Sequence, residues 1–84
     1  MPALLIKKPA EKDIAVLPPS VRDRAVSAIQ ALRETPFPHG VQKLQGLEHH
    51  YRLRVGDYRI LYTCDAPKQI ITIYRVKHRR EAYR

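Results

Sequence analysis

The chain has 84 residues, a length that suits one domain built around one core. Its hydrophobic content of 44% is that of a globular protein and excludes a largely disordered chain. Sixteen Lys and Arg residues against eight Asp and Glu residues give a formal net charge of +8 at pH 7, which indicates a polyanionic partner. We therefore expect a single domain over residues 1–84.

The sequence contains no run of about 20 apolar residues, and we expect no transmembrane helix. The N-terminus lacks the basic-then-apolar order of a signal peptide, which favours a cytoplasmic protein. Cys64 is the only cysteine, which excludes an internal disulfide and any zinc cluster built from the cysteines of one chain. We expect it to contribute to packing rather than to act as a nucleophile.

The start of the chain predicts a strand and a short helix. Residues 3–6 form an apolar run that is too brief for a helix, so we expect a strand there. Residues 9–17 begin with a proline and carry two acidic side chains near their start, which suit the positive N-terminal end of a helix. Pro18 ends this segment.

A second, longer helix is predicted from Ser20 until just before Pro36. Ser20 followed by Asp23 resembles a capping box, and apolar residues then recur at three- and four-residue spacing. The two prolines that precede this helix predict a tight elbow, so that the two helices form a hairpin. Residues 36–46 form the main loop.

After this loop the spacing of apolar residues changes from helical to alternating. Residues 51–55 and 58–63 alternate apolar and polar side chains, and the Gly-Asp step between them suits a two-residue turn. This pattern predicts a β-hairpin. A second turn at 65–68 and a β-rich segment at 69–76 complete the order β-α-α-β-β-β.

The predicted hairpin places like charges opposite each other. With a two-residue turn, Arg54 pairs directly with Arg59, on the face that the strands do not bury. Such a pair repels and costs stability, so we expect a role other than folding for it and for Arg52 on the same face. The alternative interpretation is a solvated outer face of the sheet.

The last strand is expected to extend this surface. If the four-residue turn sets the register, Arg59 lies beside Tyr74 and Leu61 beside Thr72. The result is a platform of arginines and aromatic rings that suits a phosphodiester backbone and unstacked bases. By the same parity Arg75 falls on the core face, near its rim, and we leave it out of the site.

The C-terminal residues add titratable and aromatic groups. His78, Arg79 and Tyr83 follow the last predicted strand and bring an imidazole, a guanidinium and a phenol to one end of the chain. A solvated basic tail is the alternative. His49 and His50 lack a carboxylate or thiol at ligand spacing, so we expect no metal site and no other cofactor.

In these residues the sequence resembles the RelE/ParE superfamily of bacterial and archaeal toxins, on its RelE side. The resemblance covers nearly the whole chain and is carried by residues 10–14, 17–18, 43–46, 51–62 and 76–83. Its most specific part is the tyrosine-bounded hairpin 51–62, followed at this distance by His-Arg and Tyr. The resemblance implies an α+β, RelE-like fold with a small antiparallel sheet packed against an N-terminal helical hairpin.

The resemblance also implies an activity. Toxins of this branch are endoribonucleases (mRNA interferases) that cleave messenger RNA in the ribosomal decoding site without a metal, by attack of a ribose 2′-hydroxyl on the adjacent phosphodiester. The implied roles are phosphate binding for Arg59, transition-state charge stabilisation for Arg79, and base orientation or stacking for Tyr83. Arg52 and Arg54 are expected to bind substrate.

The two hairpin arginines stand where the best-known branch of the family carries lysines, and this departure bears on proton transfer. A desolvated lysine can act as a base, whereas a guanidinium stays protonated. His78 is therefore the preferred acid or base, because histidine titrates near neutrality. Glu48, His49 and His50 are the alternatives.

The resemblance further implies partners and leaves other functions open. A cognate acidic antitoxin is expected to bind the toxin in a hetero-oligomer, and the ribosome and its mRNA are the expected targets. The competing functions are non-catalytic inhibition of DNA gyrase, as in the ParE branch, and a basic nucleic-acid-binding module. The cluster of His78, Arg79 and Tyr83 favours cleavage, because gyrase binding needs no proton-transfer groups.

Overall fold

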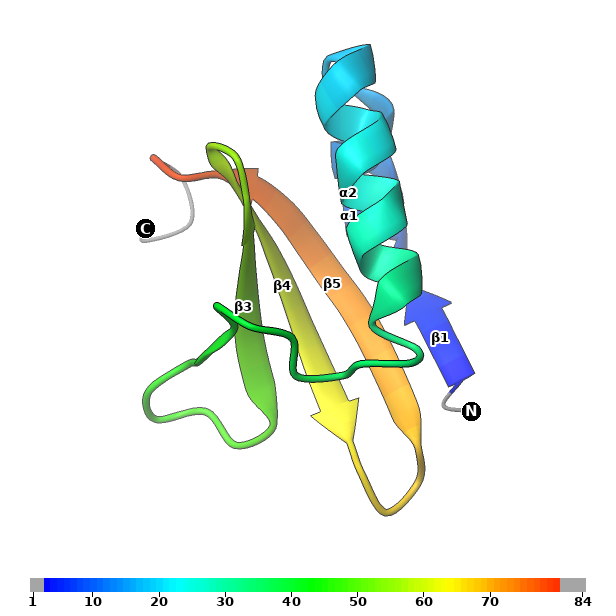
Figure 1. Ribbon diagram of the computed structural model, residues 1–84, viewed down its shortest axis with the longest axis vertical. Coiled ribbons are helices and arrows are strands. Elements are labelled where there is room, and N and C mark those ends of the chain that lie inside the picture. Colours follow the sequence, from blue (N-terminus) through cyan, green and yellow to red (C-terminus); the bar gives the residue numbers. More distant parts are fainter. Residues whose placement is uncertain (1–2, 81–84) are drawn as a thin grey trace.

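The computed structural model describes residues 3–80, in which two helices lie against one side of a sheet (Figure 1). The helices are α1 (Lys8–Ala15) and α2 (Pro19–Ala31), and the strands are β1 (Ala3–Ile6), β2 (Gln42–Lys43), β3 (His50–Val55), β4 (Tyr58–Asp65) and β5 (Ile70–His78). The strand order is β1-β5-β4-β3-β2; β1 pairs with β5 in parallel, and the other pairs are antiparallel. The α+β class and the element order are confirmed. The parallel pair makes the sheet mixed, and the loop after α2 adds the short strand β2.

The two helices form the predicted hairpin, although their boundaries differ from the prediction. α2 starts at Pro19, whose fixed φ suits the first turn of a helix. The capping box predicted at Ser20 and Asp23 is wrong, because Pro18 precedes the helix and no side chain caps it. α2 also ends earlier than predicted, and residues 32–34 continue as tight turns. Neither of the two described helices is long and apolar enough to span a membrane.

The core lies between the helices and the sheet. Alternate residues of β4 face the helices, so Ile60, Tyr62 and Cys64 are buried. They pack with buried residues of the other elements: Ala10, Leu17, Ala25, Ile29, Leu32, Leu53, Val55, Ile71, Ile73 and Val76. Burial, with the nearby charge of Asp65, raises the pKa of the Cys64 thiol, and the predicted packing role of this cysteine is confirmed.

The loop after α2 crosses the same side of the sheet as the helices (Figure 1). The Tyr62 hydroxyl donates a hydrogen bond to the Pro36 carbonyl at 2.7 Å, and the rings of Phe37 and Tyr51 meet edge to face at 4.9 Å. Burial raises the pKa of Tyr62, so its hydroxyl stays a donor at physiological pH. Within residues 3–80, the helices and this loop cover one face of the sheet, and no helix lies on the other.

The β3–β4 hairpin has the predicted register, with Arg54 opposite Arg59. Its two-residue turn begins at Gly56, which has a φ of +59°. Glycine adopts this conformation at no steric cost, whereas a residue with a Cβ would be strained at this φ. The turn therefore fixes which side chains of β3 and β4 face each other.

The predicted register between β4 and β5 is wrong. Arg59 faces Lys77 instead of Tyr74. The pairing also shifts by one residue between Leu61 and Tyr62, which is a β-bulge with Tyr74 as the extra residue of β5. The turn lies at residues 66–69 instead of 65–68, because Asp65 pairs with Ile70, and this moves the pairing by two residues before the bulge adds one more. The sequence of the turn does not reveal the bulge, because the bulge lies within the strand that follows it.

The bulge reverses which side chains of β5 face the core. Ile73 is buried before it and Val76 is buried after it, although they are three residues apart. Arg75, predicted on the core face, instead pairs with Leu61, which was predicted to pair with Thr72. Its side chain nevertheless lies at the rim of the sheet, as expected, because it reaches round to α1.

A carboxylate of α1 holds the bulged strand. Asp13 accepts hydrogen bonds from Arg75 Nε at 2.8 Å, from Arg75 Nη2 at 3.1 Å and from the backbone N–H of Val76 at 2.9 Å. Burial alone would raise the pKa of Asp13. The hydrogen bonds from Arg75 and Val76, with the charges of Arg75 and Lys77, outweigh it and hold that pKa below its ordinary value. We call this arrangement the Asp13 clasp.

We expect Asp13→Asn to lower the free energy of unfolding by about 1–2 kcal/mol at neutral pH, because charge-assisted hydrogen bonds are lost. A depressed carboxyl pKa gives stabilisation that is complete above the ordinary value of 3.8 and is lost as the pH falls through the lower folded-state value. The difference in the free energy of unfolding between wild type and variant should therefore decrease on acidification. Urea unfolding at neutral and acidic pH measures this difference. Arg75→Gln and the double variant complete a double-mutant cycle, and purely additive effects would contradict the clasp.

Candidate functional site

The face of the sheet away from the helices carries the polar side chains of the central strands. Because side chains alternate along a strand, the residues between the buried positions of β3 and β4 point to this face. They are His50, Arg52 and Arg54 on β3 and Arg59, Leu61 and Thr63 on β4. The structure thus brings the three predicted hairpin arginines to one surface, which we call the open face.

Three cations stand side by side across the open face. Arg54 pairs with Arg59, and Arg59 pairs on its other side with Lys77. Directly opposed like charges repel, so this row lowers stability, which favours a role for it outside folding. Lys77 was not among the predicted site residues, because nothing in the apolar spacing signals the bulge that places it here.

Arg52, Arg54 and Arg59, which we call the arginine cluster, line a cavity of about 320 Å³ together with Gly40 and Gln42. Arg52 donates a hydrogen bond to Gln42 Oε1, and Arg54 Nε donates to a backbone carbonyl of the hairpin turn at 3.0 Å. One terminal nitrogen of Arg59, Nη1, is buried. A cavity with three guanidiniums offers forked donors and positive charge, the pattern that binds phosphate.

Arg79 lies at the same end of the sheet as Arg54 and Arg59. Its backbone N–H donates to the Asp57 carbonyl in the β3–β4 turn at 2.7 Å, and its Nη1 lies 4.0 Å from the Asp57 carboxylate. Both side chains are more than half exposed, so this ion pair contributes little to stability. The backbone contact positions Arg79 without fixing its guanidinium. Tyr83, predicted to act with Arg79, lies outside the described residues.

His78 lies on the face opposite the arginine cluster. It pairs with Tyr58 on the side of the sheet that faces the helices, and the two rings meet edge to face at 5.2 Å. Its Nδ1 accepts a hydrogen bond from the Arg80 backbone N–H at 3.3 Å, which leaves Nε2 as the nitrogen for proton exchange. His78 therefore lies at the same end of the sheet as the arginine cluster and Arg79, but on the opposite face from the cluster.

His50 does lie on the open face, two residues before Arg52. Its Nδ1 is 2.7 Å from the Glu48 carbonyl oxygen, so Nδ1 carries the proton of the neutral ring and Nε2 can accept one. Its ring also meets that of Tyr74 edge to face at 5.5 Å. The other two alternatives, Glu48 and His49, are exposed in the preceding loop.

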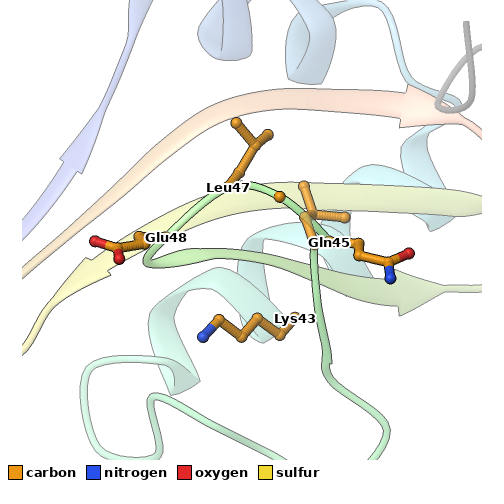
Figure 2. Close-up of a pocket in the computed structure, with 6 residues that line it drawn as sticks. Lys43, Gln45, Leu47 and Glu48 are labelled. Atoms are coloured by element: carbon orange, nitrogen blue, oxygen red, sulfur yellow. The ribbon is translucent and has the colours of Figure 1, made fainter.

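A second cavity, of about 590 Å³, belongs to the loop between β2 and β3 and is lined by residues 43–48 (Figure 2). Gln45 and Glu48 point to opposite sides of this loop, so polar groups do not converge there as they do in a built binding site. Residues 3–80 also contain no group of three or more His, Cys, Asp or Glu side chains that could hold a metal ion. We therefore take the arginine cluster as the candidate site.

Comparison with known proteins places the chain in a family. The sequence model for the ParE toxin of the type II toxin–antitoxin system parDE matches residues 4–83. RelE1 of Methanocaldococcus jannaschii is 32% identical over 82 residues, which cover 94% of this chain and 91% of that protein. Toxin RelG of Mycobacterium tuberculosis is 33% identical over 76 residues, which cover 89% of this chain and 87% of that protein.

A solved structure agrees with the sequence matches. The archaeal RelE–RelB complex from Pyrococcus horikoshii OT3 contains a chain that superposes on this one with a TM-score of 0.84 and 30% identity, over 96% of this chain and 98% of that chain. The resemblance read from the hairpin and the C-terminal residues is thereby confirmed. The chain belongs to the RelE/ParE superfamily of toxins from type II toxin–antitoxin systems, on its RelE side.

Proposed function

We propose that this toxin is a ribosome-dependent endoribonuclease that cleaves translated mRNA in the cytoplasm and so inhibits translation. The observation that carries the proposal is the arginine cluster, three guanidiniums around a cavity of about 320 Å³ on a sheet face that no described helix covers. Membership of the RelE side supports the same activity. An mRNA strand supplies the polyanion that the net charge of +8 calls for.

The proposed reaction is attack of a ribose 2′-hydroxyl on the adjacent phosphodiester, with no metal or cofactor. Arg59 binds the scissile phosphate, and Arg52 and Arg54 hold the neighbouring backbone. Arg79, at the same end of the sheet, stabilises the charge that develops on the phosphorane. Tyr83 orients or stacks on a base of the substrate.

Proton transfer falls to a histidine, because guanidiniums stay protonated. His78 directly precedes Arg79, and its Nε2 is the nitrogen that would exchange the proton. His78 can reach the substrate only where the RNA passes round the end of β5 to the helix side of the sheet. His50 shares the open face with the arginine cluster, and its Nε2 is an acceptor in the neutral ring. We propose His78 as the acid or base. His50 is the alternative, and its position on the open face with the arginine cluster favours it.

An acidic antitoxin is proposed as the partner that keeps this toxin inactive in a hetero-oligomer. The RelE chain of Pyrococcus horikoshii OT3 is seen in a complex with RelB. The row of Arg54, Arg59 and Lys77 concentrates positive charge on the open face, where an acidic segment would both neutralise the site and block it. The same surface thus accounts for inhibition and for substrate binding.

The second candidate function is non-catalytic inhibition of DNA gyrase, which the match to the ParE family model favours. Inducible expression with mapping of mRNA 5′ ends separates the two. We expect in-frame cleavage of translated messages and arrest of growth. Growth arrest with intact messages and broken DNA would contradict the ribonuclease proposal. Binding of nucleic acid without growth arrest would indicate a basic nucleic-acid-binding module.

Arg54→Ala and Arg59→Ala should each leave folding intact or slightly raise stability, because each removes a cation from the repulsive row. Cleavage on programmed ribosomes should fall by about one to two decades, since a charge-assisted phosphate contact is worth roughly 1.5–3 kcal/mol. Single-turnover cleavage and thermal unfolding measure the two effects. Arg33→Ala, which removes an exposed arginine from the turn after α2, is the charge-matched control and should cleave as wild type. A large loss of Tm in both cluster variants would instead make these arginines structural.

His78→Gln and His50→Gln form a matched pair on opposite faces of the sheet. Each keeps hydrogen-bonding capacity but removes titration, so the histidine that transfers a proton should slow cleavage by about 10²–10⁴-fold with little change in ribosome binding. The pH dependence of single-turnover cleavage identifies it. A loss confined to His50→Gln would move the role away from His78, and wild-type rates in both variants would route the proton through Glu48, His49 or ribosomal groups.

A further inference from the structure

Two rings meet on the open face beside the arginine cluster. His50 of β3 pairs with Thr63 of β4, and its ring contacts that of Tyr74 of β5 with centroids 5.5 Å apart and an interplanar angle of 67°. The contact spans β4, which lies between β3 and β5 and carries Thr63 opposite His50. We call His50 and Tyr74 the ring pair.

The bulge explains why Tyr74 reaches across the sheet. It is the extra residue where the pairing of β4 with β5 shifts, and a bulge re-aims the side chain that it inserts. Both rings are half-buried, and burial raises the pKa of Tyr74, so its phenol is neutral at physiological pH and does not repel a phosphate. The ring pair is therefore a partly exposed aromatic surface on the open face, with the neutral phenol of Tyr74 on β5 beside the imidazole of His50 on β3.

The spacing of the ring pair from the arginine cluster suits adjoining parts of one RNA strand. Arg59 and Thr63 lie four residues apart on β4, about 13 Å at the usual rise per residue. Between them Leu61 is half-buried and uncharged. Cations therefore occupy one end of the open face and rings the other. The one carboxylate in these two strands, Asp65, ends β4 beyond Thr63 and accepts a hydrogen bond from the Lys68 backbone N–H in the following turn at 3.2 Å.

We propose that the ring pair is a base-binding subsite, in which an unstacked base of single-stranded RNA stacks on Tyr74 beside His50 while the arginine cluster holds neighbouring phosphates. The inference rests on the proposed function for its substrate and names a contact separate from Tyr83. RNA combines regularly placed negative charge with flat π faces, and both features of the open face match it, whereas an acidic peptide matches the cations alone.

Binding to two fluorescent probes separates the base contribution from the phosphate contribution. One probe is an oligouridylate of about eight nucleotides, and the other is an abasic ribose-phosphate chain of the same length and charge. Fluorescence anisotropy with the full-length toxin, freed from its antitoxin, should show roughly 5- to 100-fold tighter binding of the oligouridylate, the range for stacking of one base. Tyr74→Ala and His50→Ala should lose most of this ratio, and Tyr74→Phe should keep it.

Two control variants fix the interpretation. Arg59→Ala should weaken binding of both probes to a similar extent, because it removes a phosphate contact and leaves the rings in place. Phe37→Ala removes a half-exposed ring from the loop on the other side of the sheet and should keep the wild-type ratio. Tyr74→Leu replaces Tyr74→Ala if the latter does not fold, since it keeps apolar volume without a flat ring.

Because binding rather than cleavage is measured, this inference and the proposed function can fail separately. A toxin that leaves mRNA intact but shows a Tyr74-dependent ratio supports the base subsite and defeats the ribonuclease proposal. A toxin that cleaves mRNA but gives the same ratio with and without the Tyr74 ring overturns the base subsite. Equal binding of both probes by the wild type also overturns the base subsite. So does a result in which Tyr74→Ala and His50→Ala weaken antitoxin binding but keep the wild-type ratio between the two probes.

Discussion

The β-bulge in β5 decides which chemistry the open face can present. If side chains alternated regularly from the buried start of the strand, Lys77 would point into the core and Val76 would point out of it. One extra residue, Tyr74, reverses this alternation, so that Val76 is 3% exposed and Lys77 faces Arg59. The row of three cations, the ring pair and the closure of the core at this end of the sheet all depend on that single insertion.

A bulge weakens the strand that carries it, and the Asp13 clasp offsets this cost. β1 pairs with β5 only as far as Ile73, so the next part of β5 is an edge whose backbone N–H groups need other acceptors. The Asp13 carboxylate accepts one of them, that of Val76, together with the Arg75 guanidinium. In a chain of net charge +8, the Asp13 carboxylate neutralises Arg75, which has a structural role. The cations of the open face stay clustered, in a position to bind an external anion.

The parts of the fold that could be predicted from the sequence are those set by short-range geometry. A two-residue turn with glycine first has one register, which is why Arg54 was correctly paired with Arg59. The bulge could not be predicted, because it depends on a contact between Asp13 and Val76, 63 residues apart. Two errors displaced the side chains of the site: the turn lies one residue later than predicted, so Asp65 pairs with Ile70 and Tyr74 lies away from Arg59, and the bulge then turns His78 to the helix side. The family resemblance gave the fold correctly but carried no information on this local shift.

Arg52 and Arg54 stand where a lysine could have accepted the proton, so in the proposed reaction a histidine must accept it. The position of that histidine then determines where the scissile phosphate lies. A guanidinium holds a phosphate but cannot take the proton of the attacking 2′-hydroxyl, and a general base must lie within about 2.6–3.2 Å of that hydroxyl. Of the described histidines, His50 meets this condition when the scissile phosphate sits beside Arg52, two residues further along β3. His78 meets it when the strand bends round the end of β5, where Arg79 lies. Whichever histidine carries the pH dependence of cleavage therefore also locates the bond that is cut.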